Sequence, residues 1–136
     1  MTHDTSRAHE FDFWIGDWDV FGPKGKQVGT SSITALFAGH AGGMLHEHWH
    51  GQGGVEGRSL NGYDADRDCW HQTWMDGSGG VLLLDGGLRD GAMVLEAPGQ
   101  RITWTQEADE VRQVWESSSD EGVTWTVAFD GRYVRR

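Results

Sequence analysis

The stretch Met44-Leu45-His46-Glu47-His48-Trp49-His50 shows the pattern on which the fold prediction rests. Successive side chains of a β-strand point to opposite faces, so Leu45, Glu47 and Trp49 share one face of this segment. The other face carries the three histidines. Because Leu45 and Trp49 need burial more than imidazoles do, we predict that the first face looks inward and takes Glu47 with it.

Similar short, alternating segments recur along the chain, separated by glycine-rich or charged turns. The predicted strands are residues 16–21, 27–37, 45–50, 57–63, 69–75, 81–84, 92–95, 101–105, 111–116 and 124–133. No segment has a convincing helical period, although one helical turn is expected within residues 10–15. We therefore predict an all-β fold, a single antiparallel up-and-down β-barrel of about ten strands, which can hold one small ligand.

Length and composition narrow the class of protein. The 136 residues suit one domain, which we divide into a flexible N-terminal tail (1–9) and the barrel (10–136). A formal net charge of −10 argues against nucleic acid and anionic membranes as partners, and a homodimer stays open. The polar N-terminus and the lack of a long apolar run predict a cytoplasmic location.

The segment Phe13-Trp14-Ile15-Gly16-Asp17-Trp18 resembles the opening of a lipocalin, where a helical turn leads into Gly-x-Trp on the first strand. In such barrels a late arginine packs across that tryptophan, and the resemblance implies this role for Arg132 or Arg135. The whole chain resembles a bacterial family of lipocalin-like, calycin-type barrels. The further segments that carry this resemblance are Glu47-His48-Trp49, Gly57-Arg58-Ser59-Leu60-Asn61-Gly62-Tyr63-Asp64, Trp70-His71-Gln72-Thr73-Trp74-Met75-Asp76, Arg112-Gln113-Val114-Trp115-Glu116, Gly122-Val123-Thr124-Trp125 and Phe129-Asp130-Gly131-Arg132-Tyr133. The family has no settled activity, so the resemblance implies a fold and no function.

Aligning the strands by their largest apolar residues gives one candidate inner face that is rich in tryptophan. Its members are Leu45, Glu47, Trp49, Trp70, Gln72, Trp74, Ile102, Trp104, Val111, Gln113, Trp115, Trp125, Val127 and Phe129. Apolar walls with a few polar groups are typical of sites for small molecules, here an apolar or aromatic ligand. The predicted ligand-binding residues are Glu47, Trp49, Asn61, Trp70, Gln72, Trp74, Trp104, Gln113, Trp115 and Trp125. The alternative is that the tryptophans fill the barrel and the polar groups satisfy one another.

Two other functions stay open. In the first, the protein is a cofactor-independent isomerase or hydratase with Glu47 as its catalytic acid or base, since a carboxyl group enclosed by tryptophans tends toward a raised pKa. In the second, His46, His48 and His50 hold a metal or haem. Because no carboxylate or fourth histidine stands at a recognisable spacing, we expect these histidines outside the barrel with no structural metal, and no cofactor. The sequence identifies neither the ligand nor a reaction.

Overall fold

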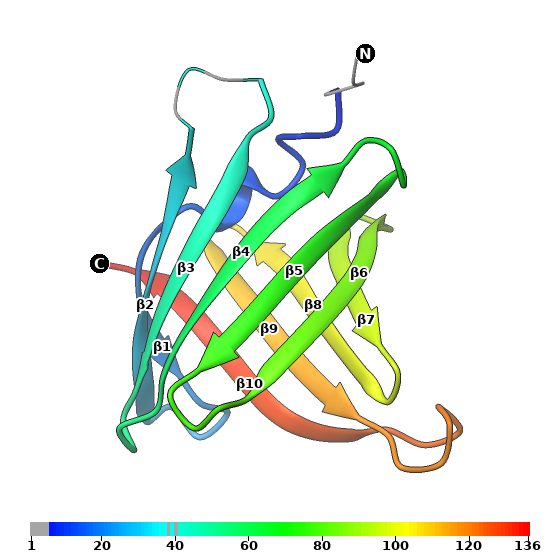
Figure 1. Ribbon diagram of the computed structural model, residues 1–136. Helices are drawn as coiled ribbons and strands as arrows, with labels where there is room; N and C mark the ends of the chain where they lie inside the picture. Colours follow the sequence, from blue (N-terminus) through cyan, green and yellow to red (C-terminus); the bar gives the residue numbers. More distant parts are fainter. Residues whose placement is uncertain (1–5, 38, 40) are drawn as a thin grey trace.

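The computed structural model describes residues 6–37, 39 and 41–136, which form one closed barrel of ten antiparallel strands (Figure 1). The strands are β1 (Gly16–Phe21), β2 (Gln27–Leu36), β3 (Met44–Gly51), β4 (Glu56–Asp64), β5 (Cys69–Asp76), β6 (Val81–Arg89), β7 (Ala92–Ala97), β8 (Gln100–Glu107), β9 (Glu110–Ser117) and β10 (Thr126–Arg135). Each strand pairs with its neighbours in the chain, and β1 closes on β10. The predicted up-and-down barrel is confirmed, as is the helical turn, a 3-10 helix η1 (Asp12–Trp14).

Burial alternates along the strands as the sequence pattern predicts. In β3, Leu45 and Glu47 are 1% and 4% exposed, whereas the three histidines between and beyond them lie on the outer face. In β5, Trp70 and Gln72 are buried and His71 between them is not. The inward face predicted for these two strands is therefore confirmed.

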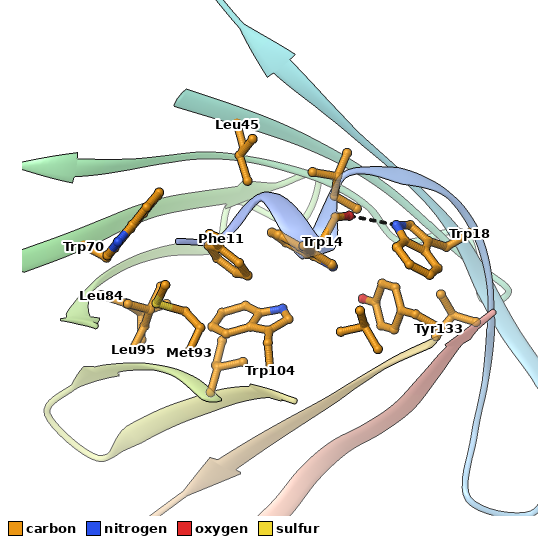
Figure 2. Close-up of a cluster of buried hydrophobic side chains, with 14 of the residues drawn as sticks. Phe11, Trp14, Trp18, Leu45, Trp70, Leu84, Met93, Leu95, Trp104 and Tyr133 are labelled. Atoms are coloured by element: carbon orange, nitrogen blue, oxygen red, sulfur yellow. Dashed lines mark hydrogen bonds between the residues drawn. The ribbon is translucent and has the colours of Figure 1, made fainter. Parts of the chain in front are cut away.

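The N-terminal segment fills one end of the barrel with aromatic rings (Figure 2). Phe11 and Trp14 stack with ring centroids 4.9 Å apart, and their centroids lie 5.1 Å and 5.4 Å from that of Trp104. The aromatic cluster consists of Phe11, Trp14, Trp18, Trp70, Trp104 and Tyr133. All six side chains are at most 1% exposed, so this end of the barrel is a solid core.

Strand β1 is joined to the aromatic cluster through Trp18. The Trp18 indole donates a hydrogen bond to the Trp14 carbonyl at 2.9 Å, drawn as the dashed line in Figure 2. On its other side, the Arg135 guanidinium lies 4.2 Å from the centroid of the Trp18 ring. Arg135 also donates to the Ile15 carbonyl at 2.9 Å. The predicted packing of a C-terminal arginine on Trp18 is confirmed, and Arg132 lies over a different ring of β1.

Two predicted inner-face placements near the C-terminus are wrong. Val127 is 56% exposed. Trp125 precedes β10 and packs against the guanidinium of Arg101, which points outward because its neighbour Ile102 is buried. The cause is an irregularity in the β9–β10 pairing between Val127 and Phe129. It interrupts the alternation of inward and outward side chains, so residues before Phe129 do not keep the face that simple counting predicts.

Part of the predicted N-terminal tail, residues 1–5, lies outside the described residues. Within the rest, Ala8 is buried and Arg7 forms an ion pair with Asp68 at 2.8 Å. This portion of the tail therefore packs against the loop between β4 and β5. Among the residues that the structure describes, no helix is long and apolar enough to cross a membrane.

We expect Arg135→Ala to lower the free energy of unfolding by about 1–3 kcal/mol, because it removes both the cation–π contact with Trp18 and hydrogen bonds to backbone carbonyls. Urea unfolding followed by tryptophan fluorescence measures this change. Arg89→Ala, which removes an exposed ion pair with Glu96, is the control and should have a much smaller effect. Equal losses in the two variants would contradict a special role for Arg135.

Candidate functional site

A cavity of about 230 Å³ occupies the end of the barrel opposite the aromatic cluster. Its lining residues are Glu47, Trp49, Val55, Gln72, Trp74, Asp76, Leu82, Ile102, Gln113, Trp115, Ala128, Phe129 and Tyr133. The turns after β3 and β5 border it, at the lower end of the barrel in Figure 1. The barrel is thus solid at one end and hollow at the other.

Glycines on the inner face allow two tryptophan rings to lie close against the barrel wall. A Cβ atom at Gly57 would lie 2.1 Å from the Trp74 ring, and one at Gly29 would lie 2.6 Å from the Trp49 ring. Both distances are shorter than any real contact between carbon atoms, so any larger residue would displace the ring. Each glycine therefore fixes the position of a cavity wall.

A chain of hydrogen bonds runs along the inner wall toward Glu47. Gln72 Nε2 donates to Asn61 Oδ1 at 2.7 Å, and Asn61 Nδ2 donates to Ser59 Oγ at 2.9 Å. The Ser59 hydroxyl then donates to Glu47 Oε1 at 2.6 Å. All four side chains are buried, and every bond points the same way. Such a chain polarises its members in sequence and stabilises negative charge on Glu47.

Burial has the larger effect on the protonation of Glu47. It raises the pKa of Glu47 to about 7, while the hydrogen bond from Ser59 acts in the opposite direction. A carboxyl group with this pKa is present in both forms at neutral pH. Glu47 can therefore accept a hydrogen bond or donate one, and it can take up or release a proton.

A second polar group lies where the cavity meets the aromatic cluster. Gln113 Oε1 accepts hydrogen bonds from Trp104 Nε1 at 3.0 Å and from the Tyr133 hydroxyl at 2.7 Å. Because an indole N–H can only donate, these bonds orient the amide and leave its amino group to donate elsewhere. Burial and the nearby Glu47 carboxylate raise the pKa of Tyr133, so its hydroxyl stays protonated.

The predicted ligand-binding residues fall into three groups. The cavity is lined by Glu47, Trp49, Gln72, Trp74, Gln113 and Trp115. Trp70 and Trp104 are fully buried in the aromatic cluster, and Asn61 is buried in the hydrogen-bond chain. Trp125 packs on an outward-facing arginine and is not part of the cavity lining.

Sequence reasoning missed three polar residues. Ser59 is two residues from Asn61 in β4, and Tyr133 is four residues from Phe129 in β10, so each pair shares one face of its strand. Both residues could therefore have been placed on the inner face. Glu56 lies on the outer face, where its carboxylate is 2.5 Å from a histidine of β3. Its place follows from the register of the β3–β4 hairpin, which sequence spacing alone does not give.

A larger hollow of about 520 Å³ lies on the outer wall beside β4 and the loop that follows it. Leu60, one of its apolar residues, is 54% exposed. The carboxylates beside it, Asp64 and Asp66, are not buried. The inner cavity is therefore the better candidate, because it combines apolar walls with a buried carboxyl group.

We expect Glu47 to make the free energy of unfolding decrease between about pH 5 and pH 8. The pKa of Glu47 is about 7 in the folded protein, against 4.5 for an unperturbed glutamate. Between these values the folded state keeps the proton that the unfolded state loses, so stabilisation present at low pH is lost as the pH rises through 7. Over the full range the loss is roughly 3 kcal/mol.

Urea unfolding of the native protein and of Glu47→Gln at about pH 5 and about pH 8 measures this effect. Relative to the Glu47→Gln variant, the native protein should have a lower free energy of unfolding at the higher pH than at the lower pH. The same substitution at exposed Glu107 is the control and should leave the pH dependence as in the native protein. A pH-independent difference for Glu47→Gln would show that the folded-state pKa is not raised.

Comparison of the chain with protein-family models gives no match, and comparison with curated proteins gives none either. The closed antiparallel barrel, with an arginine across the tryptophan of its first strand, is compatible with a calycin-like fold. Function must therefore be argued from the cavity itself.

Proposed function

We propose that the protein binds a small, flat, apolar or aromatic molecule in the cavity. The observation that carries this proposal is a buried carboxyl group, Glu47, at a cavity with tryptophan walls. Mostly apolar walls with few polar groups are typical of small-molecule sites. The volume of about 230 Å³ is below the ~300–1,000 Å³ common for drug-sized ligands, so a molecule of about two fused rings fits this proposal best.

The polar groups of the cavity favour a neutral ligand that can form hydrogen bonds. Glu47 offers an acceptor when ionised and a donor when protonated, and the Gln113 amino group offers a donor. A ligand hydroxyl can donate to the ionised carboxylate or accept a hydrogen bond from the Gln113 amide. A ligand carboxylate would be repelled by the ionised form of Glu47, so anions should bind more weakly than neutral molecules of the same shape.

The proposal includes membership of the lipocalin-like, calycin-type family and a cytoplasmic location. The segment Gly16-Asp17-Trp18 and the contact between Trp18 and Arg135 support the family.

We expect 2-naphthol to bind more tightly than naphthalene, and 2-naphthoate to bind most weakly at pH 8, as measured by isothermal titration calorimetry. Trp115→Ala should weaken 2-naphthol binding by about tenfold or more, because it removes one aromatic wall of the cavity. Trp125→Ala is the matched control, since Trp125 packs on Arg101 outside the cavity and should leave affinity unchanged.

Two results would contradict the binding proposal. One is the absence of saturable binding by any of the three compounds. The other is an equal loss of affinity in Trp115→Ala and Trp125→Ala, which would place binding outside the cavity. Circular dichroism of both variants checks that the barrel is intact.

The pKa of about 7 at Glu47 also favours a second function, proton transfer to or from a bound ligand. In this case Glu47 would act as general base toward an acidic C–H bond and return the proton at the same or another carbon. Such a reaction is an isomerisation or exchange and needs no cofactor. The carboxyl group lies at the cavity wall, where a ligand would contact it.

Exchange of α-protons of 2-tetralone for deuterium in D₂O, followed by NMR, tests this second function. The native protein should accelerate exchange above the buffer rate, and Glu47→Gln should lower the acceleration by about 10²–10⁴-fold. Glu107→Gln should exchange as the native protein does. If Glu47→Gln binds 2-tetralone and exchanges it at the native rate, Glu47 is not the base.

A further inference from the structure

The outer face of the β3–β4 hairpin brings together two imidazoles and one carboxylate at the cavity end of the barrel. His48 and His50 are two residues apart on β3, so their rings project from the same face. Glu56 begins β4 and pairs directly with His50 across the hairpin. The three side chains thus meet beside the single turn that joins β3 to β4.

The donor atoms of these side chains already lie close together. One ligand atom from each of His48, His50 and Glu56 lies within 4.8 Å of the others. His48 Nε2 is 2.5 Å from Glu56 Oε2, and the two imidazole rings are 4.1 Å apart between centroids. Ligands at ~2.0–2.1 Å from a tetrahedral zinc ion are separated by about 3.3 Å. The His48–Glu56 pair, now 2.5 Å apart, would have to separate by about 0.8 Å to reach that spacing.

We propose that His48, His50 and Glu56 bind one divalent transition-metal ion of the zinc class on the outer wall of the barrel. Two imidazoles and one carboxylate form a ligand set that zinc accepts, with a remaining position for water. The ion would replace the hydrogen bond between His48 and Glu56. This proposal is independent of what the inner cavity binds, and it replaces the expectation that the histidines hold no metal.

The third histidine of the strand has a different partner and serves as an internal control. The ring of His46 lies 6.5 Å from that of His48, and its Nε2 atom is 3.3 Å from Nη1 of Arg58. Arg58 also lies 3.9 Å from the Glu56 carboxylate. Its positive charge opposes a cation at this site, so a three-ligand site of moderate affinity is expected.

A metal ion at this site would also stabilise the part of the hairpin that forms the cavity wall. Trp49 stands between His48 and His50 in β3 and points to the opposite, inner face. An ion held by β3 and β4 together would cross-link the hairpin at the point where Trp49 forms part of the cavity wall. Metal binding should therefore raise the thermal stability of the folded protein.

Zinc titrated into the full chain without a purification tag, followed by calorimetry, tests the proposal. We expect one Zn²⁺ ion to bind per chain at micromolar concentrations. His48→Ala, His50→Ala and Glu56→Gln should each weaken binding by at least about tenfold. His46→Ala should change affinity less than about twofold. The melting temperature of the native protein should rise with Zn²⁺, and that of a His48→Ala/His50→Ala double variant should not.

Three outcomes would overturn the proposal. The first is the absence of binding at a 1:1 ratio. The second is a loss of affinity in His46→Ala as large as that in His48→Ala, and the third is full affinity in Glu56→Gln. Melting curves in EDTA show whether each variant is folded, so a loss of binding can be separated from a loss of structure.

Discussion

The stacking of Phe11 on Trp14 inside one end of the barrel is the constraint on which the rest of the structure depends. A barrel of ten strands encloses more space than its own inward side chains need to fill. The segment that carries the two rings contains only a three-residue helix, η1, before β1 begins. Its rings fill one end of the interior, and the other end is left as a cavity.

In this arrangement two opposing effects act on the protonation of the Glu47 carboxyl group. Removal from water favours the neutral form of Glu47, and the chain of donors that ends at Ser59 favours the charged form. Their balance leaves the carboxyl group near its midpoint at neutral pH. A molecule entering the cavity would shift that balance in a direction set by its own chemistry. Under the proposed function, ligand binding would therefore be coupled to the uptake or release of a proton by Glu47.

Local pattern was enough to predict the fold and half of the cavity. The alternation in β3 and β5 identified the inward face, because one face of each strand carries the large apolar residues. The same rule failed at Trp125, where an irregular pairing with β9 interrupts the alternation. The alternation rule placed Trp70 and Trp104 on the correct, inward face. It could not tell that they lie at the filled end of the barrel and not at the cavity end, because it gives no position along the barrel axis.

Other parts of the site depend on pairing that sequence spacing does not reveal. Glu56 meets the histidines because β3 and β4 are joined by a turn of a particular length, which sets the register. Trp70 packs in the aromatic cluster and not at the cavity, because the N-terminal segment folds back into the barrel and places Phe11 against it. Both are consequences of tertiary structure, and the alternation of residues along β3, β4 and β5 signals neither.

The glycines beneath the tryptophan rings give the barrel wall control over the shape of the cavity. Adding one methyl group at Gly57 would displace the whole indole of Trp74, since the new atom would occupy the position of the ring. The shape of the cavity would then change through the movement of a whole ring that lines it. In evolution, the choice of ligand in such a barrel can therefore shift through residues that never touch it.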